Sequence, residues 1–323
     1  MSDESTTRFA CFGGNCAVLV SGRGPDGDAA QATARARARM LEWHDRFTRF
    51  DESSELSVLN RDPREAVPAS PTLRALVRAA VHAARLTGGL VDPTLLGELE
   101  AAGYRRSLGA LGGPTGVELR RALGAAPERR PATPRPDARW RDIRIDDRAG
   151  TITRPPGLRI DLGGVAKGMF GDLLASTLAE HDSFAVDAAG DVRFGGRNTL
   201  PRPIAIAAPA GEAVLHTLEL QHGAAATSGI GRRAWSDAEG RPGHHLLDPA
   251  TGRPAFTGLV QVTALAPTGL EAELRAKAAL LSGPARAAEW LPDGGATIDD
   301  DGVVTVLAPS AALRAPARVR IRA

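Results

Sequence analysis

Apolar and polar positions recur along the chain with spacings that predict short strands and helices. Residues 16–22 are an apolar run that predicts a strand, and residues 28–50 place apolar side chains at helical intervals. A second helix is expected over residues 71–87, because its pattern stops at a pair of glycines. Residues 106–138 have the weakest pattern, since glycines and prolines lie there among arginines. We expect a short helix followed by a surface insertion in that region.

In the second half of the chain the predicted elements follow one another closely. Residues 142–146 alternate like a strand, with 151–153 as a hairpin partner, and a helix is expected after Gly164. The remaining predicted elements are strands near 183–194, 203–208, 213–220 and 258–265 and a helix over 268–282. Strands and helices are interspersed and no tandem repeat occurs. The pattern therefore predicts one α+β domain over residues 9–323, preceded by an N-terminal tail of residues 1–8.

Composition and charge narrow the classes of function. The hydrophobic fraction is 43% and the charged fraction 24%, as in an ordinary globular protein. A net charge of +2 is too close to zero to indicate nucleic-acid binding. No apolar run approaches the length of a membrane span, about 18 residues. The first residues are polar and lack the features of a signal peptide, so we expect a cytoplasmic protein without a transmembrane segment. Cys11 and Cys16 are too few for a disulfide framework and are a poor metal site.

Lysine is rare in this chain. Of the 40 basic residues only Lys167 and Lys277 are lysines, and the other 38 are arginines. A GC-rich coding bias explains the overall ratio but not the positions at which lysine is kept. Both lysines lie in segments with candidate chemistry, which supports a role for those segments.

The most informative segment is residues 161–168, Asp-Leu-Gly-Gly-Val-Ala-Lys-Gly. An apolar strand end runs into paired glycines and then into an alanine-rich helix. Glycines allow close approach of a ligand, and the free N–H groups of a helix N-terminus favour phosphate, to which Lys167 adds positive charge. The spacing is not that of a Walker loop. A plain strand–turn–helix junction with a surface lysine explains the same residues, so this segment alone leaves both interpretations open.

A second segment, residues 243–252, contains two adjacent histidines before Asp-Pro-Ala-Thr-Gly. His244 and His245 point in different directions, so they are not a metal-binding pair of the i, i+4 kind. One imidazole near a carboxylate is able to act as a base toward a hydroxyl group. The alternative is a turn with a structural histidine. This alternative suits His244 better, because only one histidine of the pair can face a given site.

Two further segments are less specific. Residues 227–229, Thr-Ser-Gly, are followed by Arg232 and Arg233, and this polar turn suits an oxygen-rich ligand. Glu273 and Lys277 are four residues apart on the last predicted helix. An exposed ion pair is an adequate explanation for them.

The order of these segments resembles the ApbE family of FAD:protein FMN transferases, from about residue 9 to residue 283. The matching segments are, in chain order, Phe12-Gly13-Gly14, SELSVLN at 54–60, GGLVDPT at 88–94, DLGGVAKG at 161–168, Asp172, Ala-Gly-Asp at 189–191, Thr-Ser-Gly at 227–229 and HLLDPATG at 245–252. The DLGGVAKG and HLLDPATG segments in this order are the most specific part of the resemblance.

The resemblance implies a fold, a substrate and a reaction. The fold is a single α+β domain related to the T-fold, with FAD in a central cleft. The reaction cleaves FAD and attaches FMN through a phosphoester bond to a threonine or serine hydroxyl of an acceptor flavoprotein, with release of AMP. Two other functions stay open, a non-catalytic FAD-binding protein and an FAD pyrophosphatase that releases FMN and AMP. Neither the acceptor nor the oligomeric state is indicated.

The resemblance also implies roles for individual residues. His245 is the expected general base, and Asp248 is expected to orient it or to contact the ligand. The residues expected to bind FAD are Gly13, Asn60, Asp92, Asp161, Gly163, Gly164, Lys167, Asp191, Thr227, Ser228, Gly229 and Arg232.

Departures from the family concern its Mg²⁺ site. The resemblance implies ligands at the Ala166 carbonyl and at an aspartate and a threonine four residues apart on the last helix, where this chain has Glu273 and Lys277. Glutamate is able to bind a hard cation, but a protonated lysine is not. Asp187 and Ala189 also replace an asparagine and a glycine of the family. Either the metal is displaced or weakened, or Lys277 supplies the positive charge itself.

Overall fold

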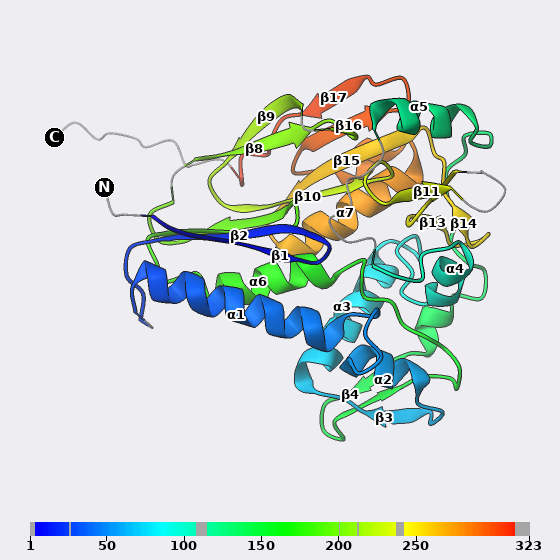
Figure 1. Ribbon diagram of the computed structural model, residues 1–323, viewed down its shortest axis with the longest axis horizontal. Helices are drawn as coiled ribbons and strands as arrows, with labels where there is room; N and C mark the ends of the chain where they lie inside the picture. The colour runs from blue at the N-terminus through cyan, green and yellow to red at the C-terminus, as the bar shows by residue number, and fades with distance from the viewer. Residues whose placement is uncertain are drawn as a thin grey trace.

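An eight-stranded antiparallel sheet forms the centre of the protein (Figure 1). The computed structural model describes residues 4–25, 27–107, 115–199, 201–211, 213–236 and 242–313. In spatial order the strands of the sheet are β1 (Ser5–Cys11), β2 (Gly14–Ser21), β6 (Ser183–Ala188), β7 (Asp191–Gly195), β10 (Gly223–Gly229), β15 (Leu259–Ala266), β16 (Gly295–Asp299) and β17 (Val304–Leu307). Every residue of β15 is buried, so this strand lies in the middle of the hydrophobic core.

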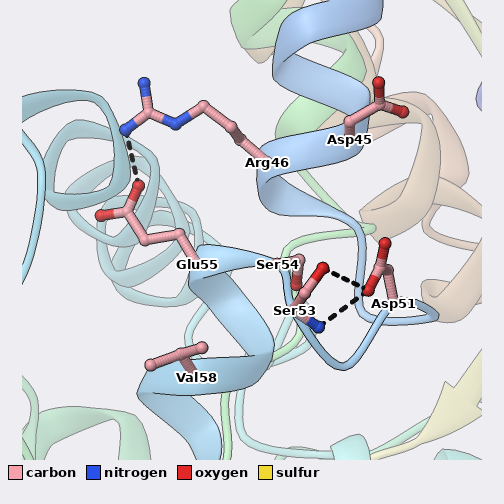
Figure 2. A pocket seen from close by; sticks show the side chains of 7 residues that line it. All are labelled: Asp45, Arg46, Asp51, Ser53, Ser54, Glu55 and Val58. Atoms are coloured by element: carbon pink, nitrogen blue, oxygen red, sulfur yellow. Dashed lines mark hydrogen bonds and ion pairs between the residues drawn. The ribbon is translucent and has the colours of Figure 1, made fainter.

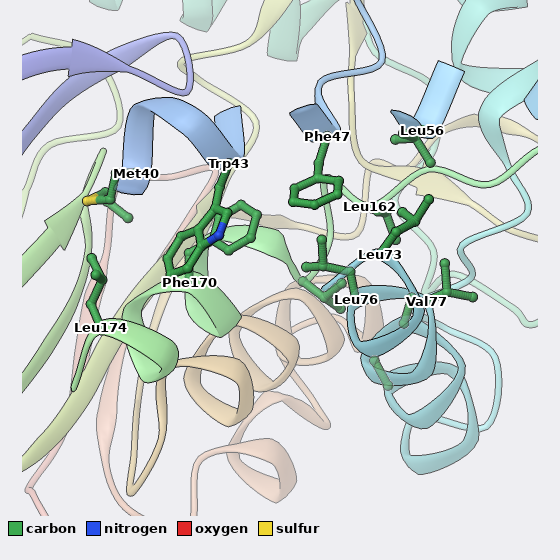
Figure 3. Packing of buried hydrophobic residues seen from close by; sticks show 14 of the residues in the cluster. Met40, Trp43, Phe47, Leu56, Leu73, Leu76, Val77, Leu162, Phe170 and Leu174 are labelled. Carbon is green, nitrogen blue, oxygen red and sulfur yellow. The ribbon is translucent and has the colours of Figure 1, made fainter. Parts of the chain in front are cut away.

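Three helices cover one face of the sheet (Figure 1), namely α1 (Ala29–Phe47), α6 (Ala166–Leu178) and α7 (Gly269–Ser282). Helix α1 packs on β1 and β2, α6 on β6 and β7, and α7 on β10 and β15. Asp28 starts α1, because its carboxylate accepts the Gln31 N–H (2.9 Å) in a capping box. Under the helices, the Phe170 ring stacks on Trp43 at 4.9 Å between centroids, beside Met40 and Leu174 (Figure 3).

The opposite face of the sheet is covered in part by a hairpin of β8 (Arg202–Ala207) and β9 (Val214–Leu220). Apolar side chains of this hairpin, such as Ile206 and Leu218, are buried in one cluster with Phe194 and Ile298 of the sheet. The central strands β6 and β15 are therefore buried on both faces and more apolar than alternation predicts, whereas the edge strand β1 alternates.

A smaller part of the molecule lies beside α1 and α6 and holds the segments at 54–60 and 88–94. Its elements are α2 (Glu55–Arg61), α3 (Pro71–Leu86), α4 (Leu96–Ala101), the 3-10 turn η1 (Arg139–Asp142) and a three-stranded sheet of β3 (Ala66–Pro68), β5 (Thr151–Thr153) and β4 (Arg144–Asp146). The remaining elements are α5 (Gly116–Gly124), η2 (Ala287–Trp290) and two short strand pairs, β11 (Ala234–Ser236) with β12 (Pro242–His244) and β13 (Leu247–Asp248) with β14 (Arg253–Pro254).

Most predicted elements are confirmed, including the four long helices α1, α3, α6 and α7 and the hairpin near residue 150. The N-terminal tail predicted at residues 1–8 is wrong for residues 5–8. These residues belong to β1, in which Ser5 pairs with Val20 of β2. Helix α5 agrees with the short helix expected in the insertion, of which residues 108–114 lie outside the described residues. The segment after α5 is more than a surface excursion, because Ala132 N–H donates to the Leu281 carbonyl (2.8 Å). Of the helices described, none combines the length and apolar character needed to cross a membrane.

Candidate active site

The DLGGVAKG segment starts from a backbone that a buried asparagine holds in place. Asn60 Nδ2 donates to the Ile160 carbonyl (2.8 Å), and its Oδ1 accepts the Ile160 N–H (2.7 Å). The next N–H group, that of Asp161, donates to the Pro93 carbonyl (2.8 Å). Because both groups of its amide bond to the backbone of Ile160, Asn60 positions this segment, and the direct FAD contact predicted for it stays a prediction.

Lys167, Asp191 and Thr227 come together at the start of α6, as predicted for a common site. Lys167 Nζ lies 2.6 Å from Asp191 Oδ2, and Asp191 Oδ1 accepts the Thr227 N–H (3.1 Å). Thr227 and Thr263 share a hydrogen bond between their hydroxyl groups (2.8 Å), and Ser228 is buried beside them. These contacts tie α6 to β7, β10 and β15, and the Lys167 side chain is 15% exposed.

Glu273 and Lys277 belong to the same site, so the exposed ion pair expected for them is wrong. The Glu273 side chain is 1% exposed and that of Lys277 is 13% exposed. Glu273 Oε1 accepts from Lys277 Nζ (3.0 Å), and Oε2 accepts the Gly168 N–H (2.8 Å). A Cβ atom placed on Gly164 would lie 3.8 Å from Lys277 Cε. Helix α7 therefore places the stem of Lys277 against Gly164, the second of the paired glycines.

His245 lies half-buried in a cationic environment. Burial lowers the pKa of its imidazole well below 6.5, and the charges of Arg233, Lys277 and Lys167 lower this pKa further. The ring packs edge-on against Tyr104 at 6.2 Å between centroids. Its Nδ1 atom is buried and has no hydrogen-bond partner within the described part of the chain. The imidazole is therefore neutral at pH 7, in the form that accepts a proton.

His244 faces the other way, into the core. Its ring packs at right angles to Phe256 (4.8 Å between centroids), and its Nδ1 accepts the Leu246 N–H (3.3 Å). Burial lowers the pKa of His244 to about 3. The structure thus gives the two neighbours different surroundings, in agreement with the prediction that His244 is structural.

We expect His244 to make the protein sensitive to acid. Its folded pKa of about 3 lies below its ordinary 6.5, so the unfolded chain takes up a proton first and stability is lost as pH falls through 6.5. The loss is about 1.4 kcal/mol per pH unit, or about 2 kcal/mol between pH 7 and pH 5. In urea unfolding, His244→Leu should therefore lose about 2 kcal/mol less stability than wild type between pH 7 and pH 5. An unchanged pH dependence in His244→Leu would contradict this assignment.

Comparison with known proteins identifies the family. The model of the ApbE family matches residues 12–298. The chain belongs to the ApbE family. It aligns with the FAD:protein FMN transferase of Escherichia coli K12 at 33% identity over 140 residues, which are 42% of this chain and only 40% of the relative. The alignment with the Treponema pallidum protein of the same name is longer, at 26% identity over 83% of this chain and 76% of the relative.

Solved structures of ApbE proteins share the fold over almost the whole chain. The ApbE protein of Thermotoga maritima has a TM-score of 0.76 and 26% identity, covering 94% of this chain and 97% of its own. The flavin transferase ApbE of Vibrio cholerae has a TM-score of 0.70 and 21% identity, covering 96% and 98%. The predicted α+β fold and the predicted family are confirmed.

The Mg²⁺ site expected from the ApbE family does not fit the residues present here. Both oxygens of Glu273 are engaged, one by Gly168 N–H and the other by the Lys277 ammonium. In the described ranges, no three His, Cys, Asp or Glu side chains lie close enough together to hold a metal ion. Of the positions that the resemblance gives for the metal, Ala166, Glu273 and Lys277, the last was not expected to be a ligand, and it presents a cation there.

The hydrogen bonds of Asp248 do not include His245, which it was predicted to orient, and the ligand contact predicted as the alternative stays a prediction. Its Oδ1 accepts the N–H groups of Thr133 (2.8 Å) and Ala250 (3.3 Å), and its Oδ2 accepts the Thr251 hydroxyl (3.0 Å). Between described residues no hydrogen bond joins Asp248 to His245. Asp248 therefore holds the HLLDPATG turn against the insertion.

The adjacent Arg232 and Arg233 lie in different surroundings, and the FAD contact predicted for Arg232 stays a prediction. Arg232 is exposed, whereas Arg233 is half-buried, and its Nη2 donates to the Phe12 carbonyl (3.2 Å). Phe12 and Gly13 form the tight turn between β1 and β2 with φ angles of 54° and 71°. The turn predicted to bind FAD through Gly13 therefore lies beside the cation that acts on His245.

Arg49 and Tyr104 were missed altogether. Arg49 lies 3.4 Å from the Asp161 carboxylate, donates to the Tyr104 carbonyl (2.8 Å) and stacks over the Tyr104 ring at 4.5 Å. Tyr104 also stacks on Trp235 at 5.7 Å and packs against His245. The one available signal was that Tyr104 is the only tyrosine in the chain.

Other family segments shape the scaffold. Ser54 caps α2 by accepting the Ser57 N–H (3.1 Å), and in the adjoining pocket Asp51 bonds to Ser53 and Glu55 pairs with Arg46 (Figure 2). These polar groups are occupied with one another. Three more residues of the family segments hold local structure. Asp172 accepts the first N–H groups of α7, Asp92 accepts from Thr94, and Asp161 accepts from Gly163 N–H.

Proposed function

We propose that this protein cleaves FAD and transfers FMN to a threonine or serine hydroxyl of an acceptor flavoprotein, with release of AMP. Relatives of the ApbE family named FAD:protein FMN transferase support this activity. The observation that carries it is a neutral imidazole, His245, set among the cations Lys167, Lys277 and Arg233. Such a site offsets the charge of a diphosphate while keeping a base able to accept a hydroxyl proton.

The chemistry follows from these groups. The acceptor hydroxyl gives its proton to His245 as its oxygen bonds to the phosphorus of the FMN half. The bond from that phosphorus to the bridging oxygen breaks, and AMP leaves with the electron pair. Lys167 and Lys277 offset negative charge that moves onto phosphate oxygens, which is the main task of a protein in phosphoryl transfer. We infer that FAD lies along the DLGGVAKG, Thr-Ser-Gly and HLLDPATG segments.

The decisive experiment combines the protein, FAD and a threonine-containing flavoprotein domain. Mass spectrometry should show the acceptor heavier by one FMN, together with an equal amount of AMP. FMN and AMP released without a modified acceptor would show an FAD pyrophosphatase, in which water replaces the hydroxyl. FAD bound with no AMP formed would show a binding protein.

We expect the protein to prefer FAD over FMN and riboflavin. Lys167 and Lys277 address a diphosphate, and a charged hydrogen bond lost with FMN weakens binding by about tenfold or more. Calorimetric titration with the three flavins measures this order. Equal affinity for FAD and FMN would contradict the placement of the diphosphate at the two lysines.

A further inference from the structure

The Lys277 ammonium is a fixed part of the site. Its stem lies against Gly164, and only 13% of the side chain is exposed. Of the described residues, Glu273 alone is within hydrogen-bond distance of its Nζ atom. An ammonium group has three N–H donors, so two remain for the oxygens of a ligand.

Both oxygens of Glu273 are occupied, one by this ammonium and the other by the first turn of α6. The carboxylate is fully buried and joins Lys277 to the Gly168 N–H at the start of α6. A metal ion bound by Glu273 would have to displace both partners and leave the ammonium uncompensated beside it. Two cations a few ångströms apart repel each other, and burial strengthens this repulsion.

A second lysine is held in the same manner from the neighbouring helix. Lys167 pairs with the buried Asp191, as Lys277 pairs with Glu273. Both lysines lie close enough to His245 for their charges to act on its imidazole. The only two lysines of the chain therefore converge on one site, each with its own carboxylate.

We propose that Lys277, held by Glu273, is a built-in cation that binds the FAD diphosphate in place of a divalent metal, so that this protein binds and cleaves FAD without Mg²⁺. The inference rests on the proposed function, because it names the group that binds the diphosphate of FAD, the substrate proposed above. Negatively charged oxygens entering a partly buried site need a counter-charge. Here an ammonium supplies it permanently, independent of the concentration of free metal.

FAD binding tests the proposal without an acceptor protein. In EDTA, titration calorimetry should give wild-type FAD affinity unchanged, within error, from that in Mg²⁺. Lys277→Met should weaken FAD binding about 10–100-fold, as expected for a lost charged hydrogen bond. Riboflavin, which has no phosphate, should bind equally to both forms. A general structural defect would weaken both flavins.

Arg275→Met is the matched control. Arg275 lies on the same helix, is similarly covered and pairs with Asp293 (2.7 Å), away from Glu273. This variant should bind FAD as wild type does. An equal loss in Arg275→Met and Lys277→Met would overturn the proposal, because the effect would then come from α7 and not from the ammonium.

Metal dependence gives a second test. Lys277→Thr frees Glu273 and removes the competing charge, so Mg²⁺ should improve FAD binding by this variant and not by wild type. FAD binding by wild type that disappears in EDTA and returns with Mg²⁺ would overturn the inference and leave the proposed function standing. Absence of FAD binding with and without Mg²⁺ would overturn both.

Discussion

Replacing His245 with alanine should lower the rate of FMN transfer by about 10²–10⁴-fold, the usual range for a lost general base. FAD affinity should change little, because the lysines that face the diphosphate remain. The rate should fall because the alanine removes a neutral imidazole that accepts the hydroxyl proton. The pKa of this imidazole is held well below 6.5 by burial and by three neighbouring cations. Single-turnover transfer at saturating FAD, followed by mass spectrometry of the acceptor, measures the effect.

The pH profile adds a readout that misfolding would not mimic. Because the pKa of His245 is lowered, wild-type transfer should keep its rate at pH 6.5 and fall only at lower pH. Arg233→Met removes one of the cations that depress this pKa, so the acidic limb should move toward neutral pH. His244→Leu should lose stability but keep the profile. A profile shifted by His244→Leu and not by Arg233→Met would reverse the assignment within the pair.

Local patterns in the sequence predicted most of the fold. Helices α1 and α3 bury one side, so their apolar positions recur at helical spacing. The junction at residues 161–168 was recognisable because its paired glycines and following helix are neighbours in the chain. Strand β1 was missed because its residues alternate between exposed and half-buried positions until Cys11, and only pairing with β2 makes them a strand.

Contacts between distant residues set the limits of prediction for the site. One of the three partners of Asp248 is the Thr133 N–H, 115 residues away, and no local pattern predicts that contact. Adjacent Arg232 and Arg233 differ only in the direction in which the chain turns them. Helix α7 is buried on most of its sides, so its sequence does not divide into a polar and an apolar face. The burial of Glu273 and Lys277 therefore could not be predicted from the pattern.

Glu273→Ala should destabilise the protein by about 3–5 kcal/mol, the cost of leaving a buried charge without its partner. The change leaves the Lys277 ammonium unpaired and the Gly168 N–H without its acceptor. Glu273→Leu combined with Lys277→Met removes both charges and should recover most of the loss. Urea unfolding of the single and double variants measures the coupling between the two side chains.

The chain offers an exposed pair as a control. Arg286 and Glu289 lie 2.8 Å apart with side chains 62% and 57% exposed, so Glu289→Ala should cost less than about 1 kcal/mol. If Glu273→Ala costs no more than Glu289→Ala, the ammonium is solvated and cannot act as a fixed cation. FAD also distinguishes a fixed ammonium from a solvated one, because its phosphate oxygens can accept hydrogen bonds from the Lys277 ammonium that Glu273→Ala leaves unpaired. Saturating FAD should therefore raise the melting temperature of Glu273→Ala more than that of wild type.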